Sequence, residues 1–204
     1  MTKTVTGLFD DYSDASSAVD QLKAAGVSDS DISIVSNNSD GRHKANDNDA
    51  AEDAGTGAGI GAAVGGVGGL LTGLGIMAIP GVGPVVAAGW LAATAAGAAA
   101  GAVVGGVTGG IVGALTDSGV DERDAHVYAE GVRRGGTLVT AKVDDARATE
   151  AEAILQRSNW VDLPARRTAY EGQGWTSFDE RSDPYSQAEI DAERGRYAGR
   201  ASII

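Results

Sequence analysis

The stretch TLVTAKVDDARATEAEAIL, residues 137–155, combines a strand pattern and a helix pattern joined by two aspartates. Residues 137–143 are rich in β-branched side chains, which favour extended backbone. Asp144 and Asp145 are residue types that accept hydrogen bonds from the free N–H groups of a helix start. Apolar residues then recur at helical spacing: Ala148, Ala151, Ile154 and Leu155. The stretch therefore predicts a strand followed by a capped helix.

The same order occurs near the start of the chain. TVTGLF (residues 4–9) reads as a strand, Asp10 and Asp11 follow it, and a helical pattern runs on to Gly26. DISIVS (31–36) closes this unit as a strand, and WVDL (160–163) closes the later one. Each unit alone buries too little apolar surface to be stable, so the two must share one sheet. We therefore predict an α+β fold, a ferredoxin-like split βαβ sandwich with a four-stranded antiparallel sheet.

A long uncharged block separates the two units. No Asp, Glu, Lys or Arg occurs between Ala54 and Thr116. Proline interrupts helices and glycine permits tight turns, so PGVGP predicts a reversal at Pro80, Gly81, Gly83 and Pro84. We predict helices over 55–79 and 84–116 that form a hairpin, each long enough to cross the roughly 30 Å of a bilayer core.

Glycine recurs at every fourth position in both predicted helices. Residues four apart share one helix face, so each row forms a groove into which another backbone can pack closely. Glycine costs on the order of 1 kcal/mol relative to alanine in a helix in water, so this glycine-zipper hairpin needs packing or lipid to form. The residues predicted to pack helices and drive oligomerisation are Gly57, Gly61, Gly65, Gly69, Gly73, Gly97, Gly101, Gly105, Gly109 and Gly113.

These patterns divide the chain into segments. We expect a first βαβ half, a polar linker, the uncharged hairpin, a second half of the α+β domain, and an acidic and aromatic tail that is partly disordered or wraps the domain. The corresponding ranges are 1–36, 37–53, 54–116, 117–165 and 166–204.

The chain resembles a known bacterial family. The resemblance rests on GLFDDYSDASSAVDQLKAAGVSDSDISIVS (7–36), the Gly/Ala-rich block, and AEGVRRGGTLVTAKV (129–143). These features are similar to the general stress protein domain family (heat-induced stress protein, 17M-like) over roughly residues 4–163. The resemblance implies a stress-linked, non-enzymatic protein and supplies no catalytic residues.

Composition narrows the classes of partner. With 16 Lys and Arg against 28 Asp and Glu, the net charge of −12 gives no reason to expect nucleic acid binding. The chain has no cysteine, which excludes disulfides, thiolate zinc sites and Cys nucleophiles. The first residues lack the apolar segment of a secretory signal. We expect the protein in the cytoplasm, or on the cytoplasmic side of a bacterial membrane.

Three interpretations of the uncharged block remain open. In the first, hairpins from several chains associate through the glycine rows in or on a membrane, so membrane lipid and further copies of the chain are the partners. In the second, the hairpins pack together inside a soluble homo-oligomer without lipid. The third is a disordered Gly/Ala segment, which the regular spacing disfavours.

No motif in the sequence supports a cofactor or a metal. GTGAGIGAAVGG (55–66) lacks the preceding strand and the G-x-G-x-x-G register of a dinucleotide-binding loop, so no cofactor is expected. His43 and His126 have no second ligand at metal spacing, so no metal is expected. We interpret the aspartate pairs at 10–11 and 144–145 as helix caps rather than cation ligands.

Arg133 and Arg134, which precede Gly135 and Gly136, are either cations at a helix C-terminus or holders of an anionic group. No nucleophile, base and orienting group can be assembled from spacing. We therefore predict no catalytic residues, no small-molecule substrate and no enzyme.

Overall fold

A computed structural model of the chain describes residues 2–41, 75–94 and 110–197. These residues form a mixed α/β structure around an antiparallel sheet of five strands in the order β1-β5-β2-β4-β3. The strands are β1 (Thr2–Phe9), β2 (Ile32–Asn37), β3 (Gly75–Ile79), β4 (Gly83–Gly89) and β5 (Thr137–Asp144).

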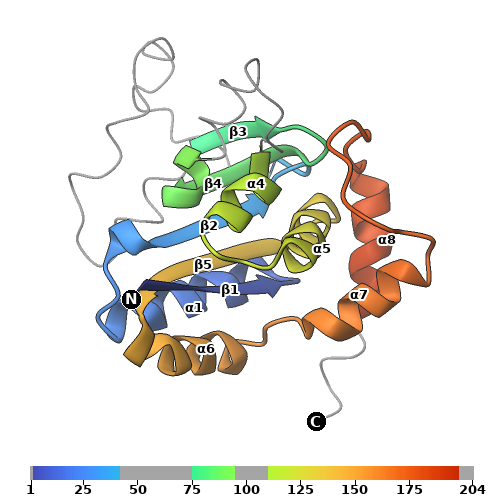
Figure 1. Cartoon of the computed structure of the whole chain (residues 1–204). Helices are drawn as coiled ribbons and strands as arrows, with labels where there is room; N and C mark the ends of the chain where they lie inside the picture. The colour runs from blue at the N-terminus through green and yellow to red at the C-terminus, as the bar shows by residue number, and fades with distance from the viewer. Residues whose placement is uncertain (1, 42–74, 95–109, 198–204) are drawn as a thin grey trace, which may run out of the picture.

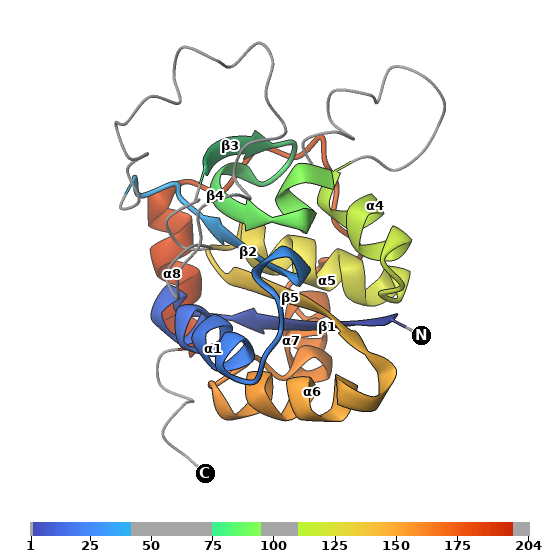
Figure 2. The same ribbon diagram turned by 90° about the vertical axis from the view of Figure 1, so that its left-hand side faces the viewer.

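Helices cover both faces of this sheet (Figures 1 and 2). One layer contains α1 (Tyr12–Ala24) and α6 (Ala148–Arg157), and the other contains α4 (Gly110–Asp117) and α5 (Glu122–Arg133). Short 3-10 helices at Asp29–Asp31 and Asp145–Arg147 precede β2 and α6. Two further helices, α7 (Leu163–Glu171) and α8 (Gln187–Tyr197), lie at the end of α5.

The strands predicted at 4–9, 31–36 and 137–143 are confirmed, as are the helices predicted after Asp11, from Asp121 and after Asp145. β5 lies between β1 and β2 and is antiparallel to both, with Thr140 opposite Thr6 on one side and Ser33 on the other. Neighbouring residues of β1 pack against opposite layers. Leu8 packs with α5, whereas Phe9 packs with α1 and α6. Gly26, at φ +85°, ends the turn after α1 as predicted.

The helical hairpin predicted for the uncharged block is wrong at residues 75–89, whereas residues 90–94 and 110–116 are helical within the range of the second predicted helix. Residues 75–79 and 83–89 are the hydrogen-bonded strands β3 and β4, and the PGVGP turn joins strands rather than helices. Val85 and Val86 are β-branched, and β4 satisfies the backbone groups of β2 on the side that β5 leaves open. Long-range pairing therefore outweighs the local pattern.

Glycine is required where this hairpin meets the rest of the fold. Gly81 and Gly83 have φ values of +73° and +96°, and Gly89 has φ +90°. A Cβ atom on Gly89 would lie 2.2 Å from the carbonyl oxygen of Ile32. No other residue type fits so close to the β2 backbone.

Most of the predicted glycine zipper lies outside the described residues. This holds for Gly57, Gly61, Gly65, Gly69, Gly73, Gly97, Gly101, Gly105 and Gly109. Gly113 is described, and it is buried within α4 of its own chain. Residues 90–94 are helical and directly follow β4.

The predicted fourth strand at 160–163 is also wrong. Residues 160–162 are irregular, and α7 begins at Leu163. Pro164 has no N–H to donate to a strand, and the Asp162 side chain accepts a hydrogen bond from the Ala165 N–H at 2.8 Å. The Val161 N–H still bonds the Leu8 carbonyl at 2.7 Å beside β1. The sheet therefore gains β3 and β4 at one side and lacks the predicted strand at the other.

The C-terminal tail wraps the domain, one of the two arrangements expected for it. Tyr170 and Ile190 are fully buried, and Phe178 belongs to the same apolar cluster as α4 and α5. The segment between α7 and α8 contacts the PGVGP turn: a Cβ atom on Gly81 would lie 2.8 Å from the Asp179 carbonyl oxygen. The tail is thus anchored to the folded core through these buried side chains.

Candidate functional site

The C-terminal end of α5 carries a group of paired charges, which are buried except for the partly exposed Asp10. We call it the Arg134 cluster and define it as Asp10, Glu130, Arg134, Arg166 and Glu193. Arg134 and Glu130 come from α5, Asp10 follows β1, and Arg166 and Glu193 come from α7 and α8. The cluster is therefore the place where the tail meets the domain.

Arg134 is bound from three sides. Its Nε donates to Glu130 Oε1 at 2.6 Å, and its Nη1 donates to Gln173 Oε1 at 2.6 Å and to Glu193 Oε1 at 3.0 Å. Burial acts to lower the pKa of Arg134, but the hydrogen bonds to Glu130 and Glu193 and the charge of Glu130 outweigh burial, so the pKa is raised. The guanidinium is therefore held fully charged.

Arg166 and Asp10 form a second, two-pronged pair. The Arg166 Nη1 and Nη2 atoms donate to the two Asp10 carboxylate oxygens at 2.8 and 2.7 Å. Burial alone would lower the pKa of Arg166. The hydrogen bonds to Asp10 act in the opposite direction and are the main reason that the pKa is raised overall. A bidentate pair fixes direction as well as distance, so it sets the position of α7 relative to β1.

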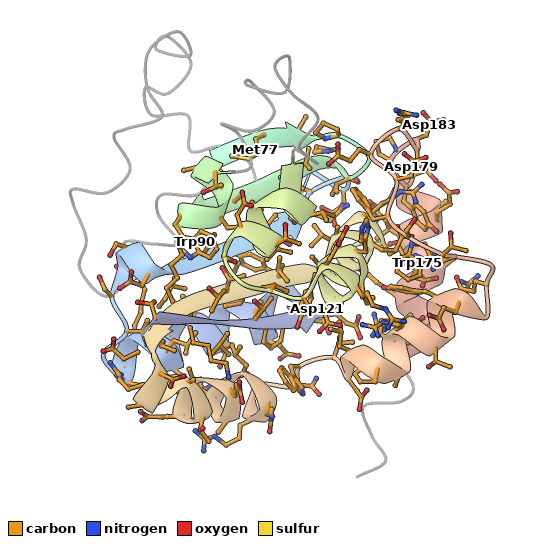
Figure 3. All side chains as sticks on the ribbon, in the orientation of Figure 1. Met77, Trp90, Asp121, Trp175, Asp179 and Asp183 are labelled. Atoms are coloured by element: carbon orange, nitrogen blue, oxygen red, sulfur yellow. The ribbon has the colours of Figure 1, made fainter. Side chains whose placement is uncertain are left out.

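Aromatic rings complete the cluster. The Arg134 guanidinium carbon lies 4.0 Å from the centre of the Tyr170 ring, and that of Arg166 lies 3.7 Å from the centre of the Tyr197 ring. Tyr170 meets Trp175 edge to face at 5.8 Å. Trp175 is labelled beside α7 and α8 in Figure 3. Each arginine is thus fixed by a carboxylate and by a ring face.

The Gly135–Gly136 loop gives α8 room to approach. Gly135 has φ +101°, and a Cβ atom there would lie 2.4 Å from Ile190 Cγ2. Arg194 Nη2 donates to the Gly135 carbonyl at 2.9 Å. The two glycines therefore end α5, as predicted, and also receive α8, which the sequence did not indicate.

The charged groups of the Arg134 cluster bind one another and so hold elements of the chain together. The cavity it lines has a volume of about 10 Å³, enough for one water molecule. Every charged member of the Arg134 cluster has an opposite charge within 3.4 Å. Such an arrangement holds α7 and α8 in place against the rest of the domain.

The structure distinguishes between the interpretations of the sequence-predicted sites. Arg133 lies in the last turn of α5, and Arg134 caps that helix while holding carboxylates of the chain itself. Asp11 occupies the N-cap position of α1 but makes no side-chain cap hydrogen bond. Asp10 binds Arg166 instead.

Other predicted positions fall in different places. Asp144 and Asp145 lie at the start of a 3-10 helix that leads into α6, again without a side-chain cap hydrogen bond. His126 lies on α5, and His43 lies outside the described residues. Within the described ranges, no three His, Asp or Glu side chains gather in a way that would hold a metal ion.

Glu193, Arg166 and Tyr170 were not identified as site residues from the sequence. The signal available was weak: scattered aromatic residues in the tail and a short helical pattern at SQAEIDAERGRY. Their partners lie far away in the chain, so spacing alone gives no hint of the cluster.

A second feature is the outer part of the sheet, β3 and β4, which we call the uncharged edge. It contains no charged residue, and β3 is the last strand of the sheet. Met77, labelled on β3 in Figure 3, packs against the apolar cluster of α4 and α5. Ile76 is 47 % exposed and is the large hydrophobic side chain that the described part of the chain leaves exposed. No helix in that part is long and apolar enough to cross a membrane.

Together the fold and the two features define a mixed α/β protein with a built-in C-terminal segment and an uncharged sheet edge. Residues 4–79 match the family model of the heat induced stress protein YflT domain, which confirms the family resemblance over these residues. The matched range contains β1, α1, β2 and β3. No curated protein and no solved structure significantly matches the chain.

Proposed function

We propose that this chain is a non-enzymatic, stress-associated protein that assembles with further copies of itself through the uncharged block Ala54–Thr116. The family domain suggests the stress-associated role. The observation that carries self-association is the uncharged edge, where β3 presents Ile76 with 47 % of its surface exposed.

Charge supports this choice of surface. Two copies that each carry a net charge of −12 repel one another over most of their surface. The uncharged block contributes no charge of its own to such a contact, and the acidic residues Asp179 and Glu180 lie beside it at Gly81. Burial of exposed apolar surface then favours association at about 25 cal/mol per Å².

The glycine rows extend the same proposal. Glycine at every fourth position, as in 97, 101, 105 and 109, is the pattern by which helices approach closely. In this proposal the rows pack against those of other copies. Gly113 is excluded from this role because it is already buried within its own chain.

Association in or on a membrane is the second candidate. The observation that favours it is the lack of any charged residue from 54 to 116, because charged side chains are costly within a bilayer. In this version, neutral lipid joins further copies of the chain as a partner, and the protein lies on the cytoplasmic side of the membrane.

The test is the particle mass of the purified full-length protein in detergent-free buffer, alone and with vesicles of phosphatidylcholine. Self-association predicts a defined particle of several times 20.4 kDa in the supernatant. Flotation of the protein with the vesicles would support the membrane candidate. A monomer that neither associates nor floats would overturn both.

A further inference from the structure

We infer that two copies of the chain pair antiparallel along their β3 strands, so that two five-stranded sheets become one continuous sheet. The inference rests on the proposed self-association and names the contact that produces it. β3 is the terminal strand of the sheet, and it is hydrogen-bonded to β4 along one side. Among the described residues, no strand pairs with its other side.

β3 lacks the features that keep natural edge strands apart. Edge strands usually carry charges, proline or a bulge, because their free N–H and C=O groups accept another strand. The sequence GIMAI has neither charge nor proline. Its register with β4 runs without a bulge from Gly75 opposite Ala87 to Ile79 opposite Gly83. The strand is therefore regular and ready to pair.

The opposite edge of the sheet shows the contrast. On β1, Lys3 forms an ion pair with Glu152 at 3.3 Å, which places charge at that edge. The Val161 N–H bonds the Leu8 carbonyl at 2.7 Å, so part of that edge is already occupied. Among the residues that the structure describes, the β1 edge is thus protected by charge and by this hydrogen bond, whereas the β3 edge has neither protection. A second copy therefore pairs at β3 and not at β1.

The side chains of β3 complement their own copy. Met77 and Ile79 pack against the core on one face, so Ile76 and Ala78 lie on the other face by alternation. In an antiparallel pair centred on Met77, Ile76 of one copy lies opposite Ala78 of its partner. A large exposed side chain then meets a small exposed one twice, which covers the exposed surface of Ile76.

Charge determines the direction of pairing. Asp179 and Glu180 lie beside Gly81, at the turn end of β3, and Figure 3 shows Asp179 and Asp183 gathered there. Parallel pairing would bring these acidic segments of two copies together. Antiparallel pairing separates the two turns by about 25 Å at roughly 3.3 Å per residue, well beyond the screening length of about 8 Å.

The first experiment replaces the exposed side chain on the edge. Ile76→Lys places two like charges at the pairing line without altering the core, so we expect the particle mass to fall by a factor of two. Ala24→Lys, on the exposed side of α1, adds the same charge elsewhere and leaves the mass unchanged. Circular dichroism of both variants checks that the fold is retained.

The second experiment does not depend on a charge. The chain has no cysteine, so Met77→Cys introduces a single thiol that lies opposite its own copy at the centre of the pair. Oxidation gives a covalent dimer in Met77→Cys and none in Ala24→Cys. If Ile76→Lys keeps the full mass and Met77→Cys does not cross-link, edge pairing is overturned while self-association stands. A monomeric wild-type chain overturns both.

Discussion

Arg134 is the residue through which the tail is tied to the domain. It binds Glu130 on its own helix, Glu193 on α8 and Gln173 after α7, and its side chain is 6 % exposed. Buried ion pairs gain little over apolar packing, but removing one partner leaves a charge buried without compensation. Replacing Arg134 is therefore expected to destabilise the fold more than its ion pairs stabilise it.

We predict that Arg134→Met lowers the free energy of unfolding by about 3–5 kcal/mol. Methionine keeps much of the volume but leaves the carboxylates of Glu130 and Glu193, 1 % and 5 % exposed, without their central cation. Urea unfolding followed by circular dichroism measures the loss. Lys3→Met breaks an ion pair whose side chains are 53 % and 40 % exposed, and it costs less than about 1 kcal/mol. Equal effects of the two variants would contradict the prediction.

At the scale of elements, the sequence predicts the helices and strands that local patterns determine, and not those that long-range pairing determines. α1, α5, α6, β1, β2 and β5 follow from periodicity, caps and β-branched residues, all of which are local. β3 and β4 form because the open side of β2 requires a partner, and that partner lies about fifty positions along the chain. A Gly/Ala/Val sequence fits a packed helix as well as a strand, so the pattern gave the wrong element there. Proline at 164 was the local signal for α7 that the strand interpretation overlooked.

In the candidate site, too, local features can be predicted from the sequence and long-range contacts cannot. Arg133 and Arg134 were identified as possible anion holders because two arginines before two glycines stand out locally. The acidic partner of Arg134 on α8, Glu193, lies 59 positions away. Nothing in the spacing of a polar tail indicates which carboxylate will meet which arginine. Only the packing of α7 and α8 against α5 brings them together.

The close packing of α5 on β1 leads us to predict that alanine lowers the stability of the fold at one helical glycine and raises it at another. A Cβ atom on Gly131 of α5 would lie 2.4 Å from Leu8 Cδ2, whereas on Gly195 of α8 it would meet nothing within 4 Å. We expect Gly131→Ala to destabilise by about 1–3 kcal/mol through overpacking. Gly195→Ala should stabilise by up to about 1 kcal/mol through helix propensity. Unfolding midpoints in urea measure both, and a gain in stability from Gly131→Ala would contradict the packing described.

At the scale of the whole molecule, the buried ion pairs and the uncharged edge lie in different parts of the described structure. Ion pairs gather where the tail docks at the end of α5, and the sheet ends in an uncharged strand on the opposite side from β1. In the proposed assembly, charge repulsion between acidic copies opposes contact elsewhere and leaves the neutral edge as the surface for association. The ion pairs that stabilise the tail and the strand proposed for assembly involve different residues, although the tail segment at Asp179 also contacts the turn between β3 and β4.

Two buried tyrosines link the stability of the whole fold to alkaline pH. Burial raises the pKa of Tyr128, with a further contribution from the charge of Asp124, and burial likewise raises the pKa of Tyr170. Below about pH 10 both residues are protonated in the folded and unfolded chains, so they have no effect on stability. Above it the unfolded chain loses protons that the folded chain keeps, so stability falls with rising pH.

We therefore predict that the free energy of unfolding decreases above about pH 10 by up to about 1.4 kcal/mol per pH unit for each of these tyrosines. Urea unfolding at a series of alkaline pH values measures the slope, and the ultraviolet absorbance of tyrosinate reports ionisation in the folded state. In Tyr128→Phe the hydrogen bond to the Thr6 carbonyl, 3.1 Å long, is lost, at a cost of about 1 kcal/mol at neutral pH. Because this variant has one fewer buried phenol, its alkaline slope should be shallower than that of the wild type. An identical slope would show that Tyr128 ionises as readily in the folded chain as in the unfolded one.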